Sequence, residues 1–173
     1  AQFNPRPPFE QASTMNALKV TSPDGVELAV QTWGASAGPE ILFFHGFNQS
    51  YLSWARQVND PAFAGCRMVT MDLRGHGASG KPEDPAFYRD DRRWADDVAE
   101  VIAATGLTRP VLVGWSYAGR VITDYVRFHG QEKIAGINFV AAVIKTGGGH
   151  MGPGRDHFKP MTNGDLALNI SGT

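Results

Sequence analysis

The chain has 173 residues, of which 42% are hydrophobic, and its formal net charge is −1. This length is enough for one domain with a sizeable core, and the balanced charge indicates neither a nucleic-acid-binding protein nor a polybasic membrane surface. No apolar run approaches the roughly 20 residues that cross a bilayer, so we expect no membrane span.

The N-terminal residues predict a loose arm over residues 1–17, because three prolines fall within the first eight positions. The sequence begins at Ala1, without an initiator methionine and without the apolar segment of a signal peptide. Two explanations stay open: a leader has been removed, or an added tail precedes a natural start at Met15. We expect a soluble protein, and the sequence leaves its compartment undecided between the cytoplasm and export.

From residue 18 onward, short apolar runs alternate with amphipathic segments. In chain order they predict strands at 18–20, 26–33 and 40–44, a helix at 51–58, a strand at 67–72, a helix at 89–105, a strand at 110–115, a helix at 116–129 and a strand at 134–144. This alternation predicts an α/β fold with a largely parallel sheet and flanking helices. The single cysteine, Cys66, starts an apolar run, so we expect a buried strand residue there and not a nucleophile.

One glycine-rich loop has the pattern of a cofactor site. Residues 75–80 match G-x-G-x-x-G and follow a strand, as in dinucleotide-binding proteins. In those proteins the loop opens directly into a helix whose N-terminus binds the pyrophosphate. Here Pro82 and Pro85 follow, and a helix starting between two prolines is disfavoured. We therefore interpret the loop as structural and expect no cofactor.

The most informative stretch is 110–120, where an apolar strand enters a tight turn of small residues and a helix leaves it. Ser116 lies at the apex of this turn. Such a turn holds a hydroxyl group clear of its neighbours at a helix N-terminus and is typical of a nucleophile elbow. Gly114 and Ala118 flank the serine, where bulk would collide as the helix crosses the strand. Taken alone, Ser116 also fits a helix N-cap.

Three motifs follow one another along the chain: His45-Gly46, then Asp72-x-Arg74-Gly75-x-Gly77-x-Ser79, then Gly114-x-Ser116-x-Ala118-Gly119. Together they resemble the α/β-hydrolase superfamily, and within it the branch of cofactor-free haloperoxidases and esterases. The resemblance implies that residues 18–146 form the N-terminal part of an α/β-hydrolase core. Residues 147–173 would begin a cap or lid, and the C-terminal strands and most of the cap would be missing.

The resemblance also implies roles for five residues. Ser116 would be the nucleophile, and the backbone N–H groups of Phe47 and Tyr117 would form the oxyanion hole. Asn48 and Trp115 would line the substrate pocket, although core packing explains Trp115 equally well. No metal ion or cofactor is needed for this chemistry.

Other polar residues fit structural roles better. His45 precedes the serine, whereas the family's order is serine, acid and histidine, so we expect His45 to shape the oxyanion loop. We expect His76 to be structural in its glycine-rich turn and His129 to suit the negative end of a helix. Asp124 lies eight residues beyond the serine, where we expect a surface or packing acid.

No acid and histidine stand where the triad would need them, because His150 and His157 fall in the expected cap. We therefore expect a carboxylesterase-like serine hydrolase that works through acyl-Ser116 and needs a C-terminal portion, supplied as a second chain. Truncation of a longer chain and completion of the site by a neighbouring copy are further explanations. The alternative function is a non-catalytic ligand-binding module derived from a hydrolase, or an inactive fragment.

The reaction expected is the hydrolysis of an ester or related acyl bond of a small molecule. Peroxyacid formation from a carboxylate is compatible with the same site as a side activity. A serine at the elbow argues against epoxide hydrolase chemistry, because those members of the superfamily use an aspartate nucleophile.

Overall fold

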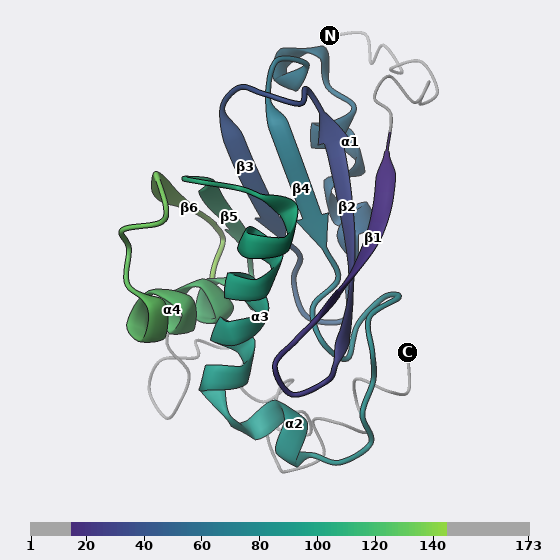
Figure 1. The fold of residues 1–173 in the computed structure, drawn as a ribbon, viewed down its shortest axis with the longest axis vertical. Coiled ribbons are helices and arrows are strands. Elements are labelled where there is room, and N and C mark those ends of the chain that lie inside the picture. Colours follow the sequence, from purple (N-terminus) through teal and green to yellow (C-terminus); the bar gives the residue numbers. More distant parts are fainter. Residues whose placement is uncertain (1–14, 145–173) are drawn as a thin grey trace, which may run out of the picture.

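The computed structural model describes residues 15–144, and over this range the chain forms a six-stranded sheet with helices on both faces (Figure 1). The strands are β1 (Asn16–Thr21), β2 (Glu27–Gly34), β3 (Glu40–Phe44), β4 (Arg67–Met71), β5 (Val111–Trp115) and β6 (Gly136–Val140). The helices are η1 (Tyr51–Trp54), α1 (Ala55–Val58), η2 (Pro61–Phe63), α2 (Ala86–Arg89), α3 (Asp91–Thr105) and α4 (Ala118–His129).

The strand order is β1-β2-β4-β3-β5-β6. β1 and β2 form an antiparallel hairpin, and β2 also pairs antiparallel with β4. The remaining pairs, β4 with β3, β3 with β5 and β5 with β6, are parallel. This arrangement confirms the largely parallel α/β sheet. Because the carboxyl ends of parallel strands lie at one edge, the loops after β3, β4 and β5 meet there.

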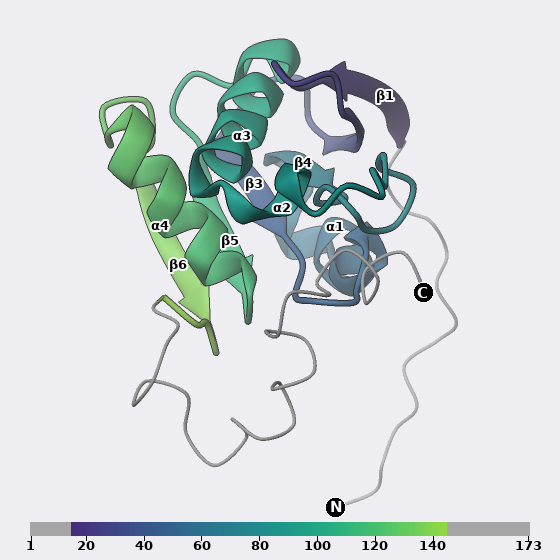
Figure 2. The same cartoon turned by 90° about the horizontal axis from the view of Figure 1, so that it is seen from below.

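The sheet separates two hydrophobic clusters. Leu42 and Phe44 of β3 pack with buried residues of α3 and α4 on one face, whereas Phe43 packs with Trp54 and Val58 of η1 and α1 on the other. Successive side chains of a strand point to opposite faces, so the uninterrupted apolar run of β3 serves both clusters. Figure 2 shows α3 and α4 on one side of the sheet and α1 on the other.

Several predicted boundaries are wrong, each for a local reason. The helix expected at 89–105 begins at Asp91 as α3, and Arg89 instead ends the short helix α2, because Asp90 has an extended backbone and its side chain caps α3 by accepting from the Arg92 N–H. The helix expected from 116 begins at Ala118, because Ser116 has a φ of 54°. The first strand starts at Asn16, so the expected arm over 1–17 runs two residues too far.

Two further expectations fail near strand ends. The strand expected at 134–144 spans only β6, since the backbone at Ala141 turns to a φ of 44°. Cys66 is half-buried in a bend before β4 and not within the strand, and its carbonyl accepts a hydrogen bond from the Ala35 N–H. The expected arm up to residue 14 and the expected cap over 147–173 lie outside the described residues.

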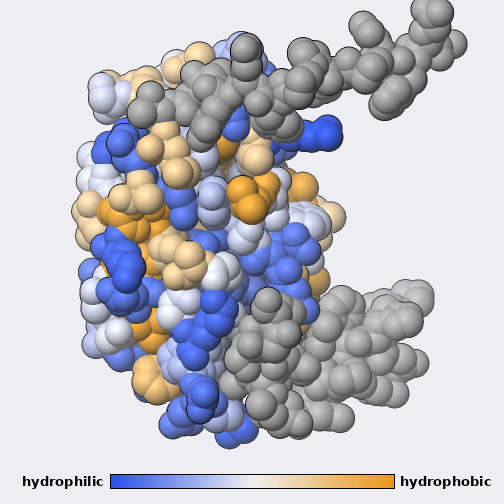
Figure 3. All heavy atoms as spheres, turned by 90° about the vertical axis from the view of Figure 1, so that its right-hand side faces the viewer, coloured by the Kyte–Doolittle hydropathy of each residue, from blue (hydrophilic) through white to orange (hydrophobic). Residues whose placement is uncertain are grey.

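On the face next to β1, hydrophilic and hydrophobic side chains are interspersed, in keeping with the exposure of that edge strand (Figure 3). Among residues 15–144, no helix has the length and apolar character that crossing a membrane requires.

A buried arginine joins three distant parts of the fold. Arg74 is fully buried, and its guanidinium donates two hydrogen bonds to Asp97 of α3, at 2.6 and 2.7 Å. It also donates to Asp24 in the β1–β2 turn, at 2.8 Å. Ser22 of the same turn donates to Asp97 at 2.5 Å. The network therefore holds the hairpin, the loop after β4 and α3 together.

We expect Asp97→Ala to lower the free energy of unfolding by about 3–5 kcal/mol, because it leaves the Arg74 charge buried without its main partner. The matched control is Asp96→Ala, which removes a partly exposed carboxylate next to it and should cost no more than about 1 kcal/mol. Urea unfolding of the two variants measures the difference, and equal losses would contradict a structural role for the buried pair.

Candidate active site

Ser116 lies in a strained turn between β5 and α4. Its φ of 54° is in the left-handed region, which is uncommon for residues other than glycine. Neighbouring backbone holds this conformation: the Ser116 N–H donates to the Val140 carbonyl at 3.1 Å, and its carbonyl accepts from the N–H groups of Gly119 and Val143. The turn therefore fixes the serine between the ends of β5 and β6 and the start of α4.

Two glycines allow the backbone to pass close to this turn. A Cβ at Gly114 would lie 3.3 Å from the Ala118 carbonyl group and 2.6 Å from the end of the Ile122 side chain, so glycine eases the close crossing of α4 over β5. A Cβ at Gly46 would lie 3.2 Å from both the Cβ of Ser116 and the ring of Trp115. The loop after β3 is therefore in direct contact with the serine.

His45 shapes this loop through both of its ring nitrogens. Nδ1 donates to the Gly46 carbonyl at 2.7 Å, and Nε2 accepts from the Leu73 N–H at 3.0 Å. Burial lowers the pKa of His45 from 6.5 to about 4, so the ring is neutral at pH 7. A ring with both nitrogens engaged in the loop is poorly suited to take a proton from Ser116.

Two backbone donors next to the serine lack partners. Within the described part of the chain, neither the N–H of Phe47 nor that of Tyr117 donates a hydrogen bond to another residue. Phe47 directly follows Gly46, which contacts Ser116, and Tyr117 directly follows Ser116 at the N-terminus of α4. An unpaired backbone N–H group is costly away from water. Such groups are available to an oxygen atom bound at the serine.

Aromatic rings gather around these donors. The rings of Phe47 and Tyr117 contact each other edge to face, with centroids 5.8 Å apart, and Tyr117 makes a similar contact with Trp94 of α3. Burial raises the pKa of Tyr117 to about 12, so its phenol is neutral. Two half-buried aromatic rings therefore lie in the loop after β3 and directly after Ser116, and Trp94 packs against Tyr117 from the core.

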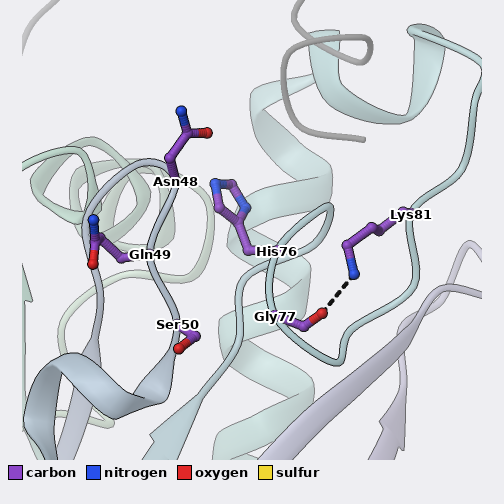
Figure 4. Close-up of a pocket in the computed structure, with 6 residues that line it drawn as sticks. All are labelled: Asn48, Gln49, Ser50, His76, Gly77 and Lys81. Atoms are coloured by element: carbon purple, nitrogen blue, oxygen red, sulfur yellow. Dashed lines mark hydrogen bonds between the residues drawn. The ribbon is translucent and has the colours of Figure 1, made fainter. Parts of the chain in front are cut away.

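A polar pocket of about 270 Å³ lies between the loop after β3 and the loop after β4 (Figure 4). It is lined by Asn48, Gln49, Ser50, His76, Gly77 and Lys81. The Nδ1 of His76 donates a hydrogen bond to the Arg74 carbonyl at 2.9 Å, which is consistent with the structural role expected for this histidine. Asn48, which the sequence predicts to bind substrate, is one of these lining residues. Its backbone has a φ of 56°.

The other sequence candidates have different surroundings. Trp115 packs against the cluster of Phe43 and Trp54, which suits the core interpretation. Asp124 is buried and pairs with Arg120 within α4. His129 ends α4, and its Nε2 lies 2.7 Å from the Asp96 carboxylate.

The glycine-rich loop over 75–80 encloses a carboxylate of its own chain. The Asp72 side chain accepts a hydrogen bond from the Ala78 N–H at 2.8 Å, and a Cβ at Gly77 would overlap that carboxylate. A negative charge at the centre of the loop disfavours a phosphate, which supports the structural interpretation. Sequence reasoning placed Asp72 in a motif but missed its contacts, which join residues far apart in the chain.

A proton acceptor for Ser116 is not among the described residues. Within residues 15–144, no histidine or carboxylate is hydrogen-bonded to the Ser116 hydroxyl. His150 and His157 lie outside the described residues. Over the same range, no three metal-ligating side chains group closely enough to hold a metal ion.

Comparison with known proteins agrees with the observed fold. A family model described as "alpha/beta hydrolase fold" matches residues 39–159. A bifunctional esterase/perhydrolase of Acinetobacter calcoaceticus is 32% identical over 83% of this chain and 52% of the relative. A non-heme haloperoxidase of Rhodococcus erythropolis is 35% identical, and the match covers 72% of this chain and 43% of the haloperoxidase. The chain thus spans about half the length of the curated relatives it matches.

Solved structures that resemble this chain are also matched over about half of their length. A crystal structure from Burkholderia cenocepacia, provisionally assigned as an aryl esterase, superposes with a TM-score of 0.74 at 48% identity. The match covers 75% of this chain and 48% of that one. Epoxide hydrolases are also among the similar proteins, for example one from Caballeronia sordidicola at 37% identity over 91 residues.

We expect the buried neutral state of His45 to make stability depend on pH. The unfolded chain takes up the proton near pH 6.5 and the folded chain near pH 4, so the free energy of unfolding falls as the pH drops through this window. The full loss attributable to His45 is about 3 kcal/mol. Urea unfolding between pH 7 and pH 4 measures it against His45→Gln, which cannot titrate, and equal pH slopes for the two proteins would contradict the expectation.

Proposed function

Because the chain belongs to the alpha/beta hydrolase fold family, we propose that it carries the nucleophile of a serine hydrolase that cleaves carboxylic esters through an acyl-Ser116 intermediate. The observation that carries the proposal is the strained elbow of Ser116, beside which the N–H groups of Phe47 and Tyr117 have no hydrogen-bond partner among residues 15–144. Similar proteins that are esterases add support.

The proposed reaction follows from this geometry. The Ser116 Oγ attacks the carbonyl carbon of the ester, and negative charge develops on the carbonyl oxygen. The N–H groups of Phe47 and Tyr117 donate to that oxygen, an interaction that is stronger in the transition state than in the ground state. The carbon–oxygen bond to the alcohol then breaks, the alcohol leaves with a proton, and water hydrolyses the acyl-serine.

The hydroxyl proton needs an acceptor, and we propose that a histidine and an acid from outside residues 15–144 supply it. They would come from the remaining residues of this chain, from further polypeptide or from a second chain. Without a base, a serine site of this kind loses orders of magnitude in rate.

The half-buried rings of Phe47 and Tyr117 support esters with an aromatic group as the substrate class. The rings of Phe47 and Tyr117 are half-buried, and an aryl group can contact them in the same edge-to-face way, whereas Trp94 is buried in the core against Tyr117. The aryl esterase assignment of the similar Burkholderia cenocepacia structure agrees with this substrate class. Peroxyacid formation stays a proposed side activity, supported by the esterase/perhydrolase relative.

Two other functions are less well supported. Epoxide hydrolases are among the relatives, but their chemistry uses an aspartate where this chain has Ser116. A non-catalytic ligand-binding module is favoured only by the lack of a base next to Ser116 within the described residues. Such a module would bind an aryl ester and leave it intact.

We expect a fluorophosphonate probe to label the intact protein at Ser116, and Ser116→Ala to abolish labelling and lower hydrolysis of 4-nitrophenyl acetate by at least ~10³-fold. Ser53→Ala is the matched control, because the buried Ser53 hydroxyl in η1 has no hydrogen-bond partner among residues 15–144 and its removal should leave both signals unchanged. Intact protein that does not react, or a Ser116→Ala variant that still does, would refute the serine mechanism.

A further inference from the structure

The loop after β3 carries Phe47, the proposed oxyanion donor. Both ends of this loop are hydrogen-bonded to the two consecutive residues Asp72 and Leu73. At its start, the Leu73 N–H donates to His45 at 3.0 Å. At its end, the Tyr51 N–H donates to Oδ1 of Asp72 at 2.7 Å. Asp72 and Leu73 are consecutive, almost fully buried, and directly follow β4.

We propose that Asp72 is a positioning residue, which holds the end of this loop so that the Phe47 N–H stays at the position of the developing oxyanion. The inference rests on the proposed function, because it concerns a donor of the same site. Asp72 acts through the backbone of the loop and does not itself touch the substrate.

The carboxylate is well fixed for this task. While Oδ1 accepts from Tyr51, Oδ2 accepts from the Ala78 N–H at 2.8 Å, so the side chain is held from both sides. The Asp72 backbone carbonyl also accepts from the Ser79 hydroxyl at 2.6 Å. The loop after β4 thereby forms a firm support for the loop after β3, and Figure 4 shows the two loops facing each other across the polar pocket.

Between its two ends, the loop is held mainly by its own bonds. The Gly46 carbonyl accepts from both the His45 ring and the Gln49 N–H, and Asn48 adopts a φ of 56°. These bonds keep the shape of the loop, while its position relative to Ser116 depends on the packing of the Phe47 ring against Tyr117 and His76 and on the attachments at its ends. The attachments at the ends are the hydrogen bonds that hold the position of the Phe47 N–H, and a displacement of about 1 Å at such a donor can cost about 10²-fold in rate.

The bond between Tyr51 and Asp72 can be removed without changing the charge. Tyr51 is the first residue of η1, where proline is well tolerated, and Ser50 before it is extended (φ −145°, ψ 179°), as a residue before proline should be. Tyr51→Pro deletes the N–H together with the side chain, whereas Tyr51→Ala deletes the side chain alone. The comparison between these variants isolates the bond.

For the intact protein, we expect Tyr51→Pro to lower kcat for 4-nitrophenyl acetate by about 10- to 100-fold relative to Tyr51→Ala, with KM changed by no more than about twofold. The concentration of active sites is measured by titration with a fluorophosphonate probe. The rate is divided by this concentration, so that unfolded protein does not contribute. A merely structural role would lower the melting temperature or the titrated fraction and leave kcat per site unchanged, and that result would overturn the proposal.

The second variant is Asp72→Asn, which tests the same proposal if Tyr51→Pro does not fold. Its amide can accept from only one of the two N–H groups and opposes the other with a donor. We expect a fall of about tenfold in kcat per titrated site, and an unchanged kcat would overturn the inference. Wild-type protein without Ser116-dependent turnover would instead refute the proposed function, and this inference with it, so the two failures are distinguishable.

Discussion

The geometry of the site depends on how closely the backbone at Gly46 approaches Ser116. Parallel pairing of β3 with β5 sets this approach, because Phe44 lies opposite Gly114 and the two strands end together. From there the loop after β3 and the elbow can meet only if no side chain stands between them, and a Cβ at Gly46 would already crowd the serine. The sheet register therefore decides which backbone N–H groups lie next to the hydroxyl.

Buried polar groups then keep the loops in place. Arg74 joins the hairpin, α3 and the loop after β4, while His45 and Asp72 connect the loop after β3 to the residues that follow β4. Each of these groups costs free energy to bury, and hydrogen bonds in fixed directions offset that cost. Because removing one partner leaves another unsatisfied, the loops have few alternative arrangements, as preorganised donors require.

The sequence predicts those parts of this fold that depend on local patterns. The alternation of apolar runs with amphipathic segments identified the strands and helices, and the small residues around Ser116 identified the elbow. Contacts between distant residues were not predictable: Ser22 and Asp97 are 75 positions apart, and Asp72 reaches Tyr51 across 21. The predicted strand at 134–144 was too long because hydrophobicity continues past Ala141, where the backbone turns away. The periodic pattern of hydrophobic residues in the sequence does not indicate where the backbone turns in this way.

The left-handed conformation of Ser116 has an evolutionary consequence. Among residues other than glycine, asparagine and aspartate tolerate positive φ best. A turn with a φ of 54° therefore accepts an aspartate in place of Ser116 at little conformational cost. One scaffold can exchange an alcohol for an acid at its apex while the sheet, the loops and the neighbouring donors stay as they are. The relatives of this chain include both an esterase/perhydrolase and an epoxide hydrolase.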